Sequence, residues 1–277
     1  MFRKLIKYEW VAMIRSMIPV YIAMIAVSLL NGIMLHIGVD INHPAYRFWD
    51  WITTYFGGLM AFLYVTVMMV LIVFTCIMII QRFYKGLLGR EGYLMLTLPV
   101  KTWELVFSKA LVSFFVSICS VIVAILSICI LGGTTFLKVF SDFSEALGEL
   151  IQMAIEYDAA ALTHMVLFCV EIVLAGAAGF FANVYQGYLS MSLGQLARNH
   201  KVAMSVVWYI GISNGVGLIS IIIMSNWPSN WLFHTDYFSE YAALHIVGAV
   251  ILLSQIIPAV IYGIGTDYIL KRKLNLE

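Results

Sequence analysis

Residues 57–80 read GGLMAFLYVTVMMVLIVFTCIMII, and they lie within 31 consecutive residues, Trp51 to Gln81, that contain no Asp, Glu, Lys or Arg. The hydrocarbon core of a bilayer is about 30 Å thick, and an apolar helix of about 20 residues crosses it. A helix satisfies all its backbone polar groups internally, as lipid requires. The stretch therefore predicts a membrane-spanning helix.

Charge-poor stretches of similar length recur along the rest of the chain. We expect six membrane-spanning helices, at about 17–37, 57–80, 107–132, 162–192, 202–224 and 245–269. The sequence lacks the strand-length alternating segments of a membrane barrel. We therefore predict an all-α integral membrane protein in which residues 1–277 form a single transmembrane domain.

The composition agrees with membrane insertion. The 277 residues are 62% hydrophobic and only 11% charged, whereas soluble domains are about 25% charged. This excludes an ordinary soluble enzyme, a disordered chain and a nucleic-acid-binding protein. The four cysteines lie inside predicted spans without a CxxC pair, so we expect reduced thiols and neither a disulfide framework nor a zinc site.

The basic residues predict the orientation. With a cytoplasmic N-terminus, 14 of the 16 Lys and Arg residues fall in inner segments, and only Arg47 and Lys138 fall outside. Cytoplasmic loops carry such an excess of positive charge. We therefore expect a protein of the plasma membrane with both termini in the cytoplasm. The first apolar run lacks a clear cleavage site, so we expect it to remain as a span.

The N-terminal segment 2–15, FRKLIKYEWVAMIR, has an amphipathic pattern. Its basic side chains gather on one side of a helical wheel, with Trp10 at headgroup level: Arg3, Lys4, Lys7 and Arg15. We predict a separate interfacial helix on the cytoplasmic leaflet. The alternative is a simple extension of the first span.

The longest inner connection, 82–109, contains a short apolar element in basic surroundings. Gly86 and Gly89 are suited to ending the second span, and Pro99 to breaking or starting a helix. An apolar element on the cytoplasmic side has to be buried against lipid headgroups, its own bundle or a protein partner. It either folds back on the membrane or docks a soluble subunit.

Two outer segments have patterns of their own. Residues 134–160 carry polar side chains at alternating steps of four and three, which predicts an extracellular amphipathic helix. Its acidic stripe is either simply solvated or attracts a cationic substrate. Residues 225–244 are rich in aromatic side chains, as interfacial belts are. The spacing of His234, Asp236, Glu240 and His245 matches no ligand pattern, so we expect no metal.

Polar side chains inside spans are candidates for function. Glu171 is the one charged residue in the interior of a predicted span, away from its ends, with His164 two turns earlier and small residues on its face. Either it is a neutral acid that donates a structural hydrogen bond, or it takes part in substrate contact or conformational change. Further polar residues would line a translocation path or a dimer interface: Asn31, Tyr64, Thr66, Ser213 and Asn214.

No nucleotide-binding or hydrolase motif is present. The sequence has no GxxxxGK(S/T), HExxH or GxSxG. We therefore expect that the chain by itself is not an enzyme and binds no cofactor directly.

One stretch and the layout resemble a known family. The stretch 90–109, REGYLMLTLPVKTWELVFSK, and the turn 193–201, LGQLARNHK, are similar to segments of small Gram-positive permeases. Together with a surface helix and six spans, they resemble an ABC-2 type permease, the transmembrane subunit of an ABC exporter. The insert at 134–160 is longer than the family's pattern.

The resemblance implies partners and a mechanism. Two permeases, as homo- or heterodimer, would pair above two cytoplasmic ATPase subunits that hold ATP and Mg²⁺. The interfacial helix would be the connecting helix. The coupling helix, which receives the ATPase stroke, would contain Arg90, Glu91, Gly92, Tyr93, Leu94, Leu96, Leu98 and Pro99.

The substrate class follows only from the apolar character of the bundle. An amphipathic or hydrophobic molecule would suit it, such as a peptide, toxin, lantibiotic or drug. The alternative function is a non-transport membrane anchor or sensor that recruits a cytoplasmic partner through the same inner connection.

Overall fold

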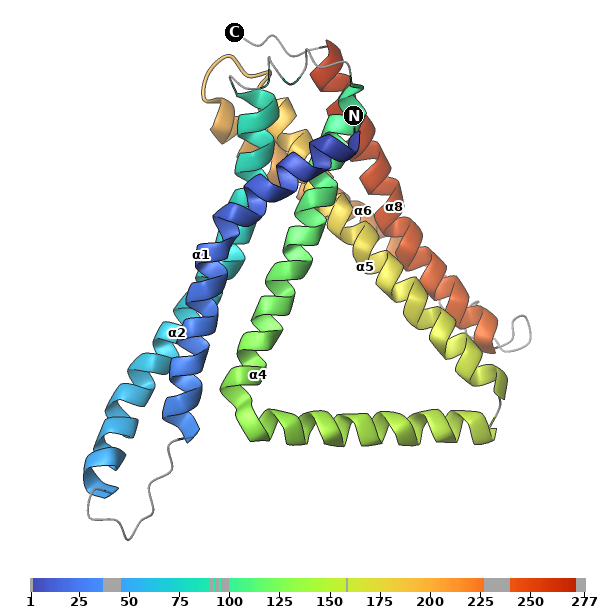
Figure 1. Ribbon diagram of the computed structural model, residues 1–277. Coiled ribbons are helices and arrows are strands. Elements are labelled where there is room, and N and C mark those ends of the chain that lie inside the picture. Colours follow the sequence, from blue (N-terminus) through green and yellow to red (C-terminus); the bar gives the residue numbers. More distant parts are fainter. Residues whose placement is uncertain are drawn as a thin grey trace. The chain divides into compact units, whose positions relative to one another are not determined.

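The computed structural model of the chain describes residues 2–36, 46–89, 92, 95, 100–157, 159–226 and 240–272. These residues form helices and contain no strand (Figure 1). The helices are α1 (Phe2–His36), α2 (Tyr46–Phe83), the π-helix η1 (Tyr84–Leu88), α4 (Thr102–Tyr157), α5 (Ala159–Gly194), α6 (Lys201–Ser225) and α8 (Glu240–Arg272).

The expectation of six apolar helices is confirmed for the described residues. Six segments are long and apolar enough to cross a membrane: Phe2–Met34, Tyr55–Leu88, Thr102–Met153, Leu162–Gly194, Lys201–Ile223 and Tyr241–Arg272. Large apolar side chains are exposed along all of them on the single chain. Such surface is stable against lipid and costly against water. The architecture is that of a multi-pass membrane protein.

Helix α1 is continuous where the sequence predicts two helices. The segments 2–15 and 17–37 join without a break, although Pro19 lies inside the helix. Proline removes one hydrogen bond and crowds the preceding turn. Packing on both sides of this point holds the helix together, because Met13 and Met17 before Pro19 are buried in one hydrophobic cluster, and Tyr21 after it packs against the same cluster. The predicted separate interfacial helix is thus the first part of α1.

Helix α4 contains the sharpest irregularity. Gly133 has φ 48° and ψ −128°, which no helical residue adopts and which glycine tolerates. The chain bends here (Figure 1) and continues as helix to Tyr157. The bend separates the predicted span at 107–132 from the predicted outer helix at 134–160. In the second part, every residue from Leu137 to Leu150 is exposed on the single chain.

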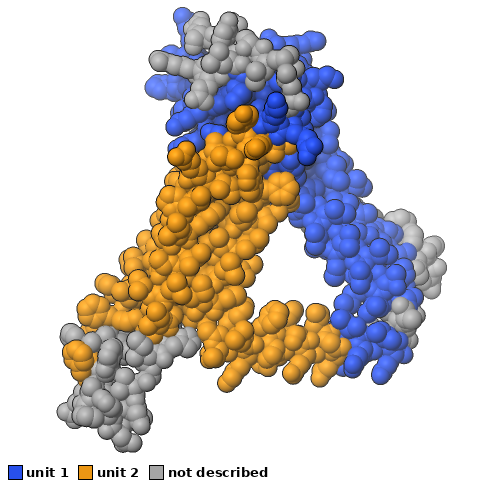
Figure 2. All heavy atoms as spheres, viewed as in Figure 1, with its two compact units in different colours: residues 1–5, 80–111, 150–277 blue, residues 6–79, 112–149 orange. Residues whose placement is uncertain are grey.

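The described chain divides into two compact units (Figure 2). Unit 1 contains residues 1–5, 80–111 and 150–277, and unit 2 contains residues 6–79 and 112–149. In unit 2, Met13 and Met17 of α1 pack on Val112 and Val116 of α4.

A polar layer adds to the packing of unit 2. The Ser120 hydroxyl lies 2.9 Å from the Tyr21 hydroxyl and 3.1 Å from that of Thr75, so hydrogen bonds link α1, α2 and α4. Such bonds hold helices together where lipid gives no hydrophobic drive for association.

In unit 1, α5 and α8 run side by side in the same direction (Figure 1). The contacts advance together along both helices, from His164 against Tyr241 to Leu189 against Gly265. Glycines of α8 face larger side chains of α5: a Cβ at Gly265 would meet Leu189 Cδ1 at 3.0 Å. Helix α6 packs on α5 as well. Small residues at the seam allow this close approach.

Candidate functional site

The connection between α2 and α4, which the sequence predicts to be the inner connection, is anchored firmly where it begins. Phe83, Leu87 and Leu88, at the end of α2 and in η1, are buried. The Phe83 ring stacks on the ring of Tyr188 from α5, with centroids 3.8 Å apart and planes inclined by 10°. The helical turn that precedes the connection is therefore fixed to α5.

The connection is also anchored where it ends. Thr102, the first residue of α4, donates its hydroxyl to Asp267 Oδ1 in the last turns of α8. The other oxygen of Asp267 accepts a hydrogen bond from Lys271 Nζ at 2.5 Å. Backbone bonds from Glu104 and Leu105 to the Lys101 carbonyl start the helix. The start of α4 is therefore tied to α8.

A buried lysine lies beside the anchored turn. Lys109 of α4 is only 3% exposed. A Cβ at Gly86 would meet its Nζ at 2.6 Å, so the glycine makes room for the ammonium group. Gly86, which the sequence suggests as a helix end, instead lies inside the π-helix and serves close approach.

Most predicted coupling residues lie outside the described part of the chain: Arg90, Glu91, Tyr93, Leu94, Leu96, Leu98 and Pro99. Gly92 is described and buried. Its N–H donates to the Gly89 carbonyl at 2.9 Å. A Cβ there would come within 2.7 Å of the Leu87 carbonyl carbon, so a side chain at this position would disturb the end of η1.

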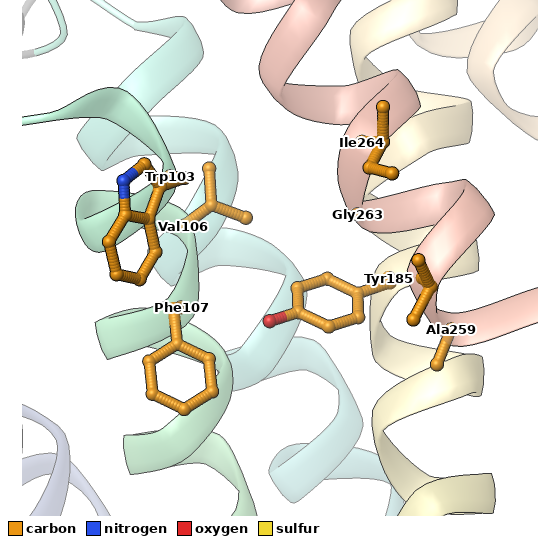
Figure 3. Close-up of a pocket in the computed structure, with 8 residues that line it drawn as sticks. Trp103, Val106, Phe107, Tyr185, Ala259, Gly263 and Ile264 are labelled. Atoms are coloured by element: carbon orange, nitrogen blue, oxygen red, sulfur yellow. The ribbon is translucent and has the colours of Figure 1, made fainter. Parts of the chain in front are cut away.

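An apolar pocket of about 270 Å³ opens between α4, α5 and α8 in unit 1 (Figure 3). Its lining consists of Trp103, Val106, Phe107, Tyr185, Ala259, Val260, Gly263 and Ile264. Figure 3 shows the Tyr185 ring reaching from α5 toward α4, with its hydroxyl oxygen on the α4 side. The pocket has the lining of a site for an apolar group and one hydroxyl for orientation.

A second polar site joins α5 and α8 within their spans. Glu171 Oε1 lies 2.8 Å from His245 Nδ1. The other ring nitrogen of His245, Nε2, lies 2.9 Å from His164 Nδ1. The ring of His164 stacks on Tyr241, with centroids 4.4 Å apart. Glu171 therefore points toward α8 and not toward lipid, as its small-residue face predicts.

The remaining predicted path residues have separate positions. In unit 2, buried Asn31 donates to the carbonyls of Val27 and Met60, and Tyr64 pairs with the Ser127 hydroxyl at 3.1 Å. Both positions serve contacts between helices. The hydroxyl of exposed Thr66 bonds back within its own helix, to the Phe62 carbonyl.

On α6, Ser213 and Asn214 are exposed on the single chain. The Asn214 side chain donates to the Ile210 carbonyl one turn earlier. Their outward position fits either a subunit interface or lipid. Ser213, Asn214 and Glu171 belong to unit 1, whereas Asn31 and Tyr64 belong to unit 2.

The predicted connecting-helix residues follow the amphipathic pattern. Arg3, Lys4 and Lys7 are exposed, whereas Trp10 is half-buried. The Trp10 ring packs edge-on against Phe115, at a centroid distance of 6.3 Å. The basic side chains of the first turns of α1 are thus exposed in the part of the chain that the structure describes.

Sequence reasoning missed two partners. It treated His245 as a weak metal candidate and gave no role to Asp267. Their positions near the helix ends of α8 were visible, but the pairing of α8 with α5 was not. Among the described residues, no group of three His, Cys, Asp or Glu side chains is placed to hold a metal ion.

No protein-family model, curated protein or solved structure matches the chain. The resemblance to ABC-2 permeases therefore stays a prediction from its residues.

Proposed function

We propose that the chain is the membrane-spanning permease subunit of an ATP-driven ABC exporter of the ABC-2 type. It would pair with a second permease, the same or different, and with two separate cytoplasmic ATPase subunits that bind ATP and Mg²⁺. Both termini would lie in the cytoplasm, beneath the plasma membrane.

The observation that supports this proposal best is the double anchoring of the inner connection. Its first end is stacked on α5 through Phe83 and Tyr188. Its second end is tied to α8 through Thr102 and Asp267. A force applied by an ATPase to the connection would therefore reach both helices at once.

The anchoring has a clear mechanical consequence. Since α5 and α8 pack against one another along their length, they would respond to the stroke as one body. A loop without such attachments would absorb the displacement in its own backbone. An exporter subunit requires this transmission, because the nucleotide chemistry occurs on another chain.

The cargo would be an amphipathic or hydrophobic molecule, such as a peptide, toxin, lantibiotic or drug. The lining of the pocket between α4, α5 and α8 is mainly apolar and aromatic. Pockets of this kind take apolar ligands and use few polar groups to orient them.

A pull-down with an ATPase assay tests the proposal. Membranes are solubilised in detergent, the permease is captured, and ATP hydrolysis of the eluate is measured. We expect an ATPase subunit with the wild type, and its loss from a variant that combines Glu91→Arg, Tyr93→Ala and Leu96→Ala. Asp142→Arg is the matched charge reversal on the predicted outer side, and it should retain the ATPase.

Absence of an ATPase from the wild-type eluate, together with absence of ATP hydrolysis, would overturn the proposal. Capture of a different soluble protein that depends on the same three residues would favour the anchor or sensor function. Equal ATPase recovery from the triple variant would instead move the docking element away from 90–100.

A further inference from the structure

Three titratable side chains form an unbroken line between α5 and α8. Glu171 Oε1, His245 Nδ1, His245 Nε2 and His164 Nδ1 follow one another with separations of 2.8 and 2.9 Å between the helices. Both nitrogens of His245 are in use, so its ring bridges the carboxyl group to the second imidazole. Lines of this type can pass protons, since each member both donates and accepts.

The line runs along the helix axis. Glu171 lies 12 residues after the start of α5 at Ala159, or about 18 Å along the axis at 1.5 Å per residue. His164 lies only five residues after that start, or about 7.5 Å. The backbone positions of Glu171 and His164 are thus about 10 Å apart along the helix axis. The shallow end is the one that the basic residues predict to face outward.

The Glu171 carboxyl group fits between the two helices, but only one of its two oxygens has a hydrogen-bond partner. Among the described residues, its Oε2 has no hydrogen-bond partner and is fully covered. A Cβ at Gly248 would collide with this oxygen, so the glycine of α8 accommodates it. A covered oxygen that lacks a partner is costly when it carries charge.

Several proton arrangements satisfy both hydrogen bonds, and two of them are the end states of a relay from His164 to Glu171. In the first, the Glu171 carboxylate accepts from His245 Nδ1–H, and His245 Nε2 accepts from His164 Nδ1–H. In the second, Glu171 O–H donates to His245 Nδ1, and His245 Nε2–H donates to His164 Nδ1, while His164 Nε2 holds a proton. The second arrangement contains one proton more and has no net charge.

The conversion between them balances proton by proton. A proton binds His164 Nε2, and the proton on His164 Nδ1 passes to His245 Nε2. The proton on His245 Nδ1 then passes to Glu171 Oε1. One proton enters from outside, and the carboxylate ends as a neutral acid.

In the described parts of α5, α6 and α8, few other titratable side chains accompany the line. On α5 the neighbouring titratable side chains are His164, Cys169 and Glu171, and the first two turns of α8 carry Glu240, Tyr241 and His245. Helix α6, which packs on α5, has no Asp, Glu, Lys, Arg or His from Val202 to Ser225, and its one tyrosine is Tyr209.

We propose that His164, His245 and Glu171 form a proton-binding relay, in which a proton taken up at His164 is stored on Glu171 within the α5–α8 pair. The ligand of this site is the proton itself. This inference goes beyond export and does not depend on it, because it rests on the geometry of α5 and α8 alone.

Infrared difference spectroscopy of the full chain in lipid nanodiscs tests the relay. The C=O stretch of a protonated carboxyl group is followed after rapid acidification, over the range in which carboxyl and imidazole groups ordinarily titrate. Labelling all glutamates with ¹³C separates their bands from those of aspartates. We expect a protonated glutamate band that appears on acidification, is absent from Glu171→Gln, and persists in Glu156→Gln, a control on the exposed helix before α5.

The rate of proton uptake distinguishes a relay from an isolated acid. His164→Phe keeps a ring for stacking on Tyr241 but removes the entry nitrogen. We expect the same final band, reached more slowly by a factor on the order of 100, which is the lower end of what a positioned proton-transfer group contributes. This comparison uses wild-type Glu171, so it stays decisive even where Glu171→Gln does not fold.

Two results would overturn the proposal. One is a Glu171 band that does not respond to pH, which would leave the cluster as a static hydrogen-bonded contact. The other is an equally fast rise of the band in His164→Phe, which would mean that protons reach Glu171 by another route.

Discussion

The stacked pair Phe83 and Tyr188 should show a measurable energetic coupling. We consider replacement of each ring by leucine, alone and together. The two side chains are 0% and 1% exposed, and their centroids lie 3.8 Å apart. Leucine keeps much of the buried apolar volume but removes the ring-to-ring contact, so it isolates that contact better than alanine does.

The magnitude follows from the geometry. A buried aromatic pair contributes about 0.5–1.5 kcal/mol beyond the area that it buries. Each single replacement also loses packing, which we place at about 1.5 kcal/mol or somewhat more. The double replacement should therefore cost about 1 kcal/mol less than the sum of the singles, since the pair contact is lost only once.

The assay is the free energy of unfolding in mixed micelles, measured by titration with a denaturing detergent and followed by circular dichroism. A control cycle combines Phe83→Leu with Phe62→Leu. Phe62 is 73% exposed and lies 21 positions away in α2, or about 31 Å along the helix. The control should be additive, because distant sites add within about 0.3–0.5 kcal/mol. Additivity of the Phe83 and Tyr188 pair to the same limit would refute the anchoring of the inner connection on α5.

Three further perturbations test other parts of the molecule. Gly133→Ala should destabilise the folded protein by about 1–3 kcal/mol, because the positive φ at this position strains any side chain. Gly148→Ala, with no atom near its Cβ, should stabilise the protein by up to about 1 kcal/mol. Thermal unfolding in detergent compares the two variants, and equal shifts in melting temperature would contradict the bend. Gly194→Ala should cost about 1–3 kcal/mol by overpacking, since its Cβ would meet the Lys201 carbonyl oxygen at 2.8 Å; an unchanged melting temperature would argue against the tight turn between α5 and α6. In a cysteine-free background, Ser144→Cys should react with an impermeant maleimide on intact cells, whereas Lys85→Cys should react with it only after permeabilisation. The reverse pattern of labelling would contradict the predicted orientation.

Much of the fold was predictable from where charges are missing. The gap between Asp50 and Arg82 predicts α2 because lipid excludes unpaired charge and demands a helix. The spacing of polar residues at steps of four and three predicts the part of α4 that follows Gly133, because residues three and four positions apart lie on one face of a helix. Both signals are local, so one sequence suffices to read them.

The boundary within α1 was not predictable by the same means. A basic amphipathic segment followed by an apolar one predicts two helices. Continuity depends on Met13 and Met17 packing against Val112 and Val116, almost a hundred residues away. Such tertiary contacts override local preference.

The pairing of α5 with α8 could not be read from the sequence either. Glu171 is recognisable as a polar residue in a span, and His245 as one near a helix start. Their meeting depends on which helices pair and in what register, which here follows from complementary shapes such as Gly248 against Glu171. No periodicity within one helix carries that information.

The pairing of Glu171 with His245 also sets an order in biosynthesis. The two residues are separated by 74 positions, so at about 5–20 residues per second the ribosome completes His245 about 4–15 s after Glu171. During that interval the nascent α5 enters the membrane with Glu171 but without the His245 imidazole that later forms a hydrogen bond with it. A chain truncated before α8 never gains that imidazole, and it should be held by membrane chaperones or cleared by quality-control proteases. Helix α8, which is made later, thus completes the hydrogen bonding of the acid on α5.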